Sequence, residues 1–314
     1  MNSCELSFII PAYNEEENIS NTLAKIKQYT PSKYRYEVIV VDHGSSDSTA
    51  QLAEQHGANA IIKRGGTISG LRNSGVEASS GEVLIFIDAD ISLTAQWQNN
   101  IPPVIERLRN NAKVLTGSWY CIPEEPNWIE KYWFEPLQKL NNTHINSGHM
   151  IISRKCFNEL SGFDEKLETG EDYDISMRAK ANGLEVIDDH ALKVIHEGYP
   201  KSLREFILRE YWHGKGDASS ISAMMTSKVA LASLIIMLFN LGLLFSAAWF
   251  NIPAMAIFMG GIVAVCLISS YQKFNKEPAG VIAVNMVLYY FYFIARGASI
   301  IMKPFRRGLK KRQR

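Results

Sequence analysis

Three long and nearly uncharged stretches in the last third of the chain most constrain its fold. They run over Val229–Phe250, Ala254–Tyr271 and Gly280–Met302. A helix of about 20 apolar residues spans the roughly 30 Å of hydrocarbon in a bilayer. The first stretch has that length, the second is shorter, and the third carries Asn285 and Arg296. Segments so long and apolar are not typical of soluble proteins, so the sequence predicts a membrane anchor.

Basic residues predict how this anchor is oriented. Lys228 precedes the first stretch and Lys273 and Lys276 follow the second, whereas the short turn 251–253 is uncharged. Because basic residues stay on the cytoplasmic side, we expect a tight hairpin that goes out and returns. The basic tail 303–314 also favours the inside, and three full spans would place it outside. We therefore expect two spans and a third helix that is interfacial or re-entrant, with three ordinary spans as the alternative.

The remaining composition suits a cytoplasmic catalytic domain on a multi-pass protein of the cell membrane. The net charge is +1, which predicts no nucleic-acid partner. The four cysteines form no CxxC pair, so neither a zinc site nor a disulfide framework is expected. We predict a catalytic domain over 1–200, an amphipathic or linker helix region over 201–227, membrane helices over 228–302 and a basic cytoplasmic tail over 303–314. Within 201–227, a helix could lie on the bilayer with its apolar face, Phe206, Ile207 and Tyr211, inward.

The first 200 residues alternate between strand-like and helix-like patterns. Short apolar runs occur at Leu6–Ile10, Glu37–Val41 and Glu82–Ile87. A helical spacing of apolar residues follows the first run, and shorter helical segments follow the others. This alternation predicts an α/β fold, a Rossmann-like and mostly parallel sheet with helices on both faces.

Acidic residues fall where these strands end. Asp42 and Asp88 each follow directly on a buried-type strand, and the turn 11–15 occupies the same place after the first strand. Ligands of open α/β sheets bind outside the carboxyl ends of the strands, so we expect one shared site. Asp88 and Asp90 point to the same side and repel one another unless a cation lies between them. Mg²⁺ or Mn²⁺ suits such oxygen ligands and takes further oxygens from phosphate groups, which predicts a diphosphate ligand.

Several motifs in order resemble the glycosyltransferases of family 2, which have the GT-A fold. The resemblance covers about residues 6–200 and rests on Ile10-Pro11-Ala12-Tyr13-Asn14-Glu15-Glu16, Val41-Asp42-His43-Gly44-Ser45-Ser46-Asp47-Ser48-Thr49, Arg72-Asn73-Ser74-Gly75, Asp88-Ala89-Asp90, Gly162-Phe163-Asp164-Glu165 and Gly170-Glu171-Asp172-Tyr173-Asp174 with Arg178. It implies an inverting, metal-dependent and hexosyltransferase-like enzyme that uses a nucleotide-sugar donor. His43 departs from the pattern, because the family usually has a second acid there.

The resemblance also implies residue roles. The donor-binding set would be Pro11, Ala12, Tyr13, Glu15, Asp42, Arg72 and Asp88. Within it, Asp42 would bond the base, Glu15 the ribose, and Arg72 would lie by the base or the diphosphate. The divalent metal would be held by Asp90, with Asp88 beside it or bonding the ribose, and with His196 as an additional ligand or else a packing residue.

The general base implied by the resemblance is Asp172. Attack by an acceptor hydroxyl on the anomeric carbon requires a carboxylate that takes up the proton. Glu171 is a competitor, and either acid could instead serve the start of a helix. His149 either faces the acceptor or is a structural histidine.

The acceptor is expected to be a lipid or a lipid-linked glycan, because the anchor holds the site near a bilayer. A polyprenyl phosphate would need basic residues at the mouth of the site, for which Arg204, Arg209, His213 and Lys215 are available. The QxxRW motif of processive synthases is absent, which favours a single transfer. A nucleotidyltransferase and a catalytically inactive nucleotide-binding membrane protein are the alternatives, although no glycine-rich phosphate loop follows the first strand. A homo-oligomer is left open.

Overall fold

The computed structural model describes residues 4–110, 113–138, 143–217 and 221–312, with the side chains of 215–217, 221–223 and 303–312 excepted. Two compact units divide the chain. The first comprises residues 1–124 and 140–199, and the second comprises residues 125–139 and 200–314. The side chains of Lys215 and of the predicted basic tail 303–314 therefore lie outside the described part of the chain.

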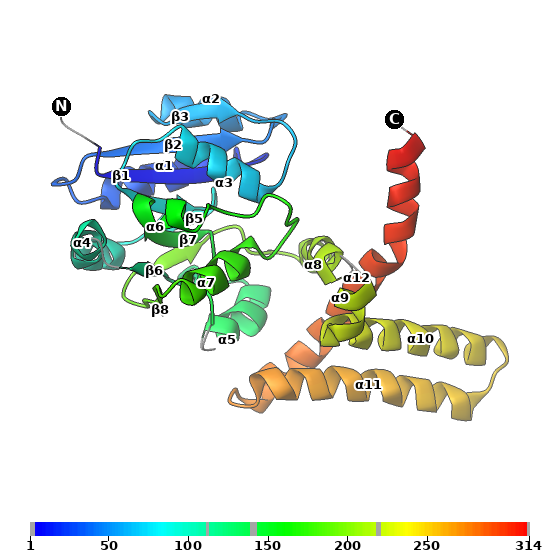
Figure 1. Ribbon diagram of the computed structural model, residues 1–314. Coiled ribbons are helices and arrows are strands. Elements are labelled where there is room, and N and C mark those ends of the chain that lie inside the picture. The colour runs from blue at the N-terminus through cyan, green and yellow to red at the C-terminus, as the bar shows by residue number, and fades with distance from the viewer. Residues whose placement is uncertain (1–3, 111–112, 139–142, 218–220, 313–314) are drawn as a thin grey trace. The chain divides into compact units, whose positions relative to one another are not determined.

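The first unit is built on a seven-stranded sheet in the order β3-β2-β1-β4-β7-β6-β8 (Figure 1). The strands of this sheet are β1 (Leu6–Ala12), β2 (Tyr36–Asp42), β3 (Asn59–Ile62), β4 (Val83–Ile87), β6 (Val114–Gly117), β7 (His149–Ser153) and β8 (Glu185–Asp188). β1 to β4 are mutually parallel and β7 runs antiparallel to both of its neighbours. A smaller sheet pairs β5 (Ile91–Leu93) with β9 (Val194–His196).

Helices cover both faces of the large sheet, as the apolar strands require. β1 and β4 are buried along their whole length, which is typical of parallel strands between two helical layers. The helices of this unit are α1 (Ile19–Tyr29), α2 (Thr49–Gln55), α3 (Ile68–Glu77), α4 (Ala95–Arg109), α6 (Arg154–Glu159) and α7 (Glu171–Ala181). The prediction of a mostly parallel sheet between helices is confirmed.

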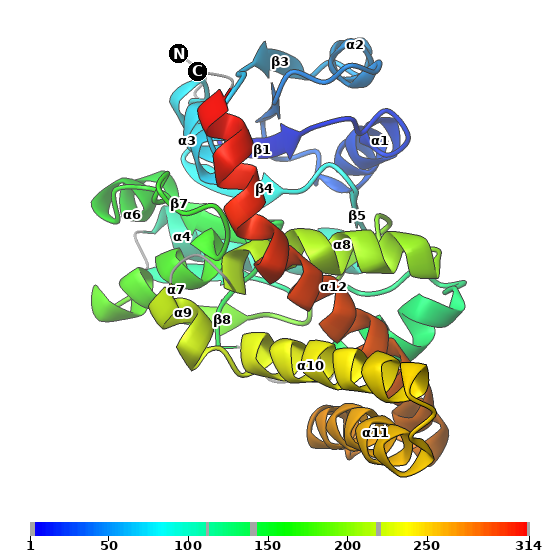
Figure 2. The same cartoon turned by 90° about the vertical axis from the view of Figure 1, so that its right-hand side faces the viewer.

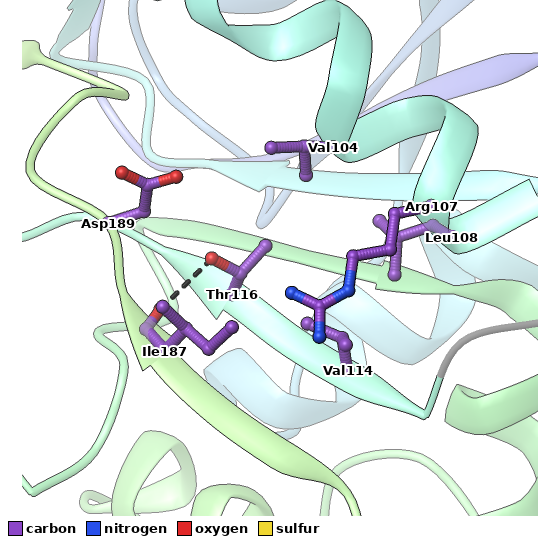
Figure 3. Close-up of a pocket in the computed structure, with 7 residues that line it drawn as sticks. All are labelled: Val104, Arg107, Leu108, Val114, Thr116, Ile187 and Asp189. Carbon is purple, nitrogen blue, oxygen red and sulfur yellow. Dashed lines mark hydrogen bonds between the residues drawn. The ribbon is translucent and has the colours of Figure 1, made fainter.

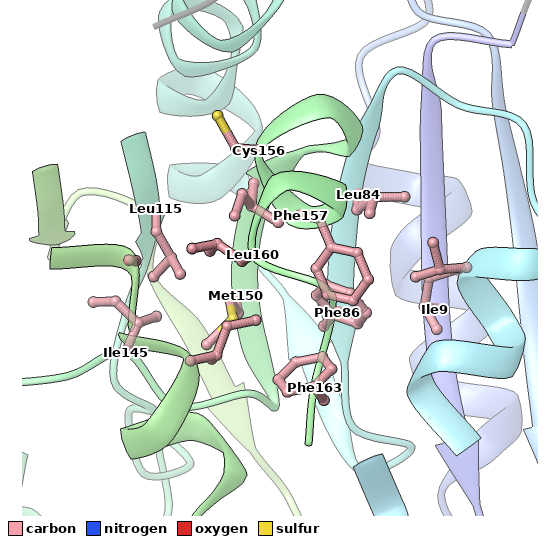
Figure 4. Packing of buried hydrophobic residues seen from close by; sticks show 14 of the residues in the cluster. Ile9, Leu84, Phe86, Leu115, Ile145, Met150, Cys156, Phe157, Leu160 and Phe163 are labelled. Carbon is pink, nitrogen blue, oxygen red and sulfur yellow. The ribbon is translucent and has the colours of Figure 1, made fainter. Parts of the chain in front are cut away.

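The main apolar core lies between the sheet and the layer that contains α3, α6 and α7 (Figure 4). Phe86 of β4 stands at its centre, with its ring 5.3 Å from that of Phe157 and 5.1 Å from that of Phe163. On the opposite face, Phe8 of β1 packs near Trp97 of α4, at 6.3 Å between ring centroids. The sheet is therefore fixed from both sides, and its strand ends are held in place.

The second unit is helical. Its elements are η1 (Glu130–Phe134), α5 (Glu135–Gln138), α8 (Leu203–Asp217), α9 (Ile221–Thr226), α10 (Lys228–Ala248), α11 (Ile252–Phe274) and α12 (Ala279–Arg312). α10 and α11 lie side by side as a tight hairpin, as predicted (Figure 2). In the described part of the chain, Lys228–Ala248, Ile252–Phe274 and Ala279–Met302 are long and apolar enough to cross a membrane.

The polar residues of the third apolar stretch have partners inside this unit. The amide of Asn285 donates to the carbonyl of Tyr132 (2.7 Å). The guanidinium of Arg296 pairs with Glu210 of α8 (2.8 Å), a carboxylate that is almost fully buried. Polar groups within an apolar helix are costly unless they are paired in this way. α12 is continuous through both positions, so it contains no break of the kind a re-entrant segment needs.

Two details differ from the sequence prediction. Residues 125–139 group with the helical unit, although they fall inside the predicted catalytic range 1–200. The cause is Trp133, which is 3% exposed and packs on the rings of Tyr289 (5.0 Å) and Phe206 (5.1 Å). Phe206 was predicted to face the bilayer. It is instead buried under Trp133, so α8 packs against protein on that side.

Candidate active site

The ends of three parallel strands lie next to one another at one edge of the sheet. β1 lies between β2 and β4, and Ala12 at its end pairs with Asp42 at the end of β2. On its other side β1 pairs with β4, whose last residue is followed by Asp88. The chain order reverses between β1 and β4, and such switch points form ligand sites in open α/β sheets. The predicted convergence of the turn 11–15, Asp42 and Asp88 is what the topology brings about.

The turn after β2 is organised by the Asp42 carboxylate. Asp42 is 2% exposed, and its Oδ1 accepts hydrogen bonds from the amides of Gly44 (3.1 Å) and Ser45 (2.8 Å). Beside it, the ring of Tyr13 is 57% exposed and meets His43 edge to face at 5.9 Å. Pro11 and Ala12 are buried beneath this pair. An exposed aromatic face next to a fixed carboxylate suits a flat, hydrogen-bonding ligand such as a nucleotide base.

Arg72 of α3 is a fully buried cation held between two acids. Its guanidinium bonds Asp88 Oδ1 (2.7 Å) and Glu171 Oε1 (2.8 Å) and lies over the ring of Phe163. Burial opposes the charge, but the two carboxylates outweigh it and raise the pKa of Arg72. Arg72 therefore orients Asp88 and Glu171. Glu171, the competitor for the role of base, is committed to this ion pair.

Asp90 and His196 are brought together by the small sheet. β5 pairs with β9 so that Ile91 lies opposite His196, and His196 Nε2 comes within 3.5 Å of Asp90 Oδ2. Gly198 permits this, because a Cβ there would lie 1.9 Å from Asp90 Oδ2. A carboxylate oxygen and an imidazole nitrogen at this spacing suit adjacent ligand positions on Mn²⁺. No group of three His, Cys, Asp or Glu side chains with metal-site geometry occurs among the described residues, so a cation here would need phosphate or water oxygens as well.

Tyr120 is a buried residue next to Asp88 and His196, and no sequence pattern identified it. Burial raises its pKa well above the ordinary value, and the negative charges of Asp88, Asp90 and Asp172 add to this while Arg72 opposes it. Its hydroxyl donates to Asn146, and its ring lies 5.0 Å from that of His196. The pKa of this buried phenol is thus affected by all three carboxylates of the predicted metal and base positions. No local pattern marks Tyr120, because it lies in an irregular segment after β6.

Gly148 leaves the space in which Tyr120 and Asp88 meet. A Cβ at this position would lie 2.1 Å from the Tyr120 hydroxyl and 2.2 Å from Asp88 Oδ2. We expect Gly148→Ala to displace both groups, to destabilise the fold by about 1–3 kcal/mol and to lower donor affinity at least about tenfold. Thermal unfolding and nucleotide titration measure the two effects. Gly260→Ala is the matched control, because a Cβ at Gly260 has nothing within 4 Å. Equal behaviour of the two variants would contradict this packing.

Asp172 lies in the first turn of α7 with one oxygen committed. Its Oδ1 accepts from the amide of Tyr173 (2.8 Å), and its Oδ2 lies 3.8 Å from His144 Nε2. Burial raises its pKa, and the neighbouring Glu171 adds to the rise. A carboxylate with a raised pKa is a better proton acceptor, which suits a general base.

The pKa of Glu15 is raised by burial and by the acidic residues near it. Burial and then the charges of Asp90 and Asp88 raise its pKa to about 7, against a hydrogen bond from Asn18. A raised carboxyl pKa favours the folded state below the unfolded value and loses this contribution as pH rises through about 7. We expect metal-free protein to lose stability between about pH 4.5 and pH 7, and Glu15→Gln to flatten this part of the curve. Melting temperatures across that range test it, and Glu16→Gln is the control.

His149 is a structural histidine, which is the second of the two alternatives that the sequence left open. It is 0% exposed, and the indole of Trp97 donates to its Nε2 (3.0 Å). Its Nδ1 lies 2.9 Å from the hydroxyl of Ser118, which donates onward to the Leu192 carbonyl. Burial lowers its pKa to about 3, so it stays neutral.

A small hollow lies away from these groups, between α4 and the strands β6 and β8 (Figure 3). Its volume is about 40 Å³. Binding sites for drug-sized ligands measure about 300–1,000 Å³, so this hollow is too small for a nucleotide sugar. It is lined by Val104, Arg107, Leu108, Val114, Thr116, Ile187 and Asp189.

Sequence comparisons agree with the geometry of the strand ends. The model of "Glycosyl transferase family 2" matches residues 7–161, and that of "Glycosyl transferase family group 2" matches residues 141–294. The glycosyltransferase AglE of Haloferax volcanii is 28% identical over 242 residues, which are 72% of this chain and 76% of the relative. An uncharacterized glycosyltransferase of Mycobacterium tuberculosis is 32% identical over 191 residues, covering 58% of this chain and 82% of the relative.

A solved structure has the same fold. It is a mannosyltransferase from Pyrobaculum calidifontis in complex with GDP-Man and Mn²⁺, with a TM-score of 0.58 at 14% identity. The alignment covers 96% of this chain and 88% of the other. At this identity the likeness concerns the fold alone.

Proposed function

Since this chain belongs to glycosyltransferase family 2, we propose that it is an inverting, metal-dependent enzyme that transfers one sugar from a nucleotide-sugar donor to a lipid or lipid-linked acceptor. The observation that carries the proposal is the set of acids at the switch point of the sheet: Asp90 lies 3.5 Å from His196, and Arg72 joins Asp88 to Glu171, the neighbour of Asp172 in α7. The donor's base would stack at Tyr13 and bond Asp42, and Glu15 would meet the ribose. The fold neighbour solved with GDP-Man and Mn²⁺ supports a donor of this class.

The transfer is a single displacement. The oxygen of the acceptor hydroxyl forms a bond to the anomeric carbon as the bond from that carbon to the phosphate oxygen breaks. Asp172 takes the hydroxyl proton, and the nucleoside diphosphate leaves with the electron pair. Asp90, with His196 and with Asp88 beside it, would hold a divalent cation. When bound, the cation supplies Lewis-acid stabilisation of the diphosphate charge.

Arg72 acts on the donor indirectly in this scheme. Its guanidinium is already bonded to Asp88 and Glu171 and is 1% exposed. Arg72 therefore keeps Asp88 in the orientation that faces the donor, and it holds Glu171 away from the role of base. Asp172 is left as the acid with an oxygen directed to the acceptor.

The class of acceptor is inferred from the apolar helices that could anchor the chain in a membrane. The three helices that are long and apolar enough to cross a bilayer belong to the same chain as the site, so the substrate is expected at a membrane. Positive charges at Lys228, Lys273 and Lys276 favour a cytoplasmic catalytic unit. We propose a polyprenyl phosphate or a glycan carried on one as the acceptor.

A labelled-donor assay tests the proposal. Full-length protein in vesicles with polyprenyl phosphate and Mn²⁺ receives radiolabelled GDP-mannose, UDP-glucose, UDP-N-acetylglucosamine or UDP-N-acetylgalactosamine in turn. We expect one donor to transfer label to the lipid fraction, with equimolar release of nucleoside diphosphate and a product of inverted anomeric configuration. A product of retained configuration would contradict the single displacement. Nucleotide binding without any transfer to lipid would contradict the proposal that the acceptor is a lipid.

A further inference from the structure

The imidazole of His144 lies beside Asp172, the proposed base, and neighbouring aromatic rings restrict its orientation. Its Nε2 is 3.8 Å from Asp172 Oδ2. Its ring is held edge to face between Trp119, at 5.5 Å, and Tyr173, at 5.6 Å. The indole of Trp119 also donates to the His144 carbonyl (3.2 Å), which fixes the backbone below the ring.

The two ring nitrogens have unequal surroundings. Nδ1 is buried and has no hydrogen-bond partner among the described residues, whereas Nε2 faces a carboxylate. A proton on Nδ1 would bury an unsatisfied donor and leave the Nε2 lone pair facing the Asp172 oxygen. A proton on Nε2 gives that oxygen a donor. Since unsatisfied buried donors are costly, the surroundings select the tautomer with the proton on Nε2.

We propose that His144 is a positioning residue whose Nε2–H holds the Asp172 carboxylate ionised and aimed at the acceptor hydroxyl. This inference rests on the proposed function of Asp172. The separation of 3.8 Å is longer than a hydrogen bond, and catalytic hydrogen bonds commonly shorten only when substrate is bound. With Oδ1 fixed by the Tyr173 amide, a donor at Oδ2 leaves the carboxylate a single orientation.

The charges around this pair favour such a donor. Burial and then the neighbouring Glu171 raise the pKa of Asp172, while the Tyr173 amide and the charge of Arg72 lower it, as a protonated His144 would. Among the described residues, Tyr173 of α7 packs on His144, and the charge of Asp172 adds to the raised pKa of Tyr120 in the segment after β6. The ammonium of Lys180 donates to the backbone carbonyl of Thr143. A hydrogen bond from the neutral Nε2–H also favours the ionised carboxylate, so removing His144 is expected to raise the pKa of Asp172 and to shift the acidic limb of the rate profile to higher pH.

Kinetics with matched variants test the proposal. We expect His144→Leu to lower kcat roughly tenfold with an unchanged KM for the donor, and to move the acidic limb upward. His144→Gln, which retains an N–H donor, should stay within about threefold of wild type. His190→Leu is the control, because His190 lies 3.9 Å from Asp188 in a similar pair and its side chain is 69% exposed. An unchanged kcat in His144→Leu, or a loss expressed in the donor KM, would overturn the proposal.

A measurement without turnover separates this inference from the proposed function. The chain has seven histidines, and in ¹⁵N-histidine-labelled full-length protein the His144 signal is assigned by its loss in His144→Gln. We expect a neutral ring protonated at Nε2, whose resonances change in Asp172→Asn and not in Asp164→Asn, at an exposed carboxylate that accepts from the Lys166 amide. A ring protonated at Nδ1, or one insensitive to Asp172, would refute the proposal. If the expected signal is found while the wild-type protein transfers no sugar, the interaction of His144 with Asp172 is supported and the proposed function is contradicted.

Discussion

Replacing Asp172 by asparagine is expected to lower turnover by about two to four orders of magnitude and to leave donor binding unchanged. Asparagine has the same shape and can still accept the hydrogen bond from the Tyr173 amide at Oδ1. It cannot take a proton from the acceptor hydroxyl. Initial rates with saturating donor, together with titration of the nucleoside diphosphate, measure the two quantities separately.

The pH profile gives this prediction a second test. The base must be ionised to accept the proton, and burial together with Glu171 raises the pKa of Asp172. Wild-type kcat should therefore fall on acidification at a pH above the ordinary range for an aspartate, and Asp172→Asn should lack this limb.

Asp174→Asn is the matched control for Asp172→Asn. Asp174 lies in the same first turn of α7 but pairs with Arg178 at 2.6 Å. It should lose some stability and little activity. Normal turnover in Asp172→Asn would remove Asp172 as the base.

The site residues that could be predicted from the sequence are marked by patterns in the residues next to them. Asp42 and Asp88 each follow an apolar strand, and parallel neighbours bring such ends to one edge of a sheet. The positions of these acids therefore followed from the strand pattern alone. The identification of the membrane segments rested on the same kind of local information, because a long uncharged stretch is visible without any tertiary contact.

The residues that the sequence missed depend on distant pairings. Tyr120 and His144 lie in irregular segments on either side of residues 125–139, and neither shows a periodic pattern. The need for glycine at position 198 arises from tertiary structure, because the pairing of β5 with β9 places Gly198 against the Asp90 carboxylate. Trp133 likewise joins the helical unit through rings more than 70 residues further along the chain. Such contacts are set by the fold, and single-sequence patterns do not encode them.

Removing the divalent cation is expected to abolish transfer, and Asp90→Ala should reproduce most of that loss. Burial, and after it repulsion from Asp90 and Asp88, raises the pKa of Glu15 to about 7. A donor diphosphate would add further negative charge to this edge, so without a cation the site repels its own substrate. Protein treated with EDTA should bind the nucleotide sugar at least about a hundredfold more weakly than protein with Mn²⁺.

Calorimetric titration of donor with and without Mn²⁺ measures this difference, and Mn²⁺ binding followed by electron paramagnetic resonance identifies the ligands. Asp90→Ala should lose the Mn²⁺-dependent part of donor affinity, and His196→Ala should lose a smaller share. Asp164→Ala is the control, because Asp164 is exposed and its carboxylate accepts from the Lys166 amide (2.9 Å). If EDTA-treated protein bound and transferred the sugar as well as the Mn²⁺-loaded protein, the acids at the switch point would have to be neutralised by protons instead. Turnover would then rise on acidification, where a carboxylate base predicts that it falls.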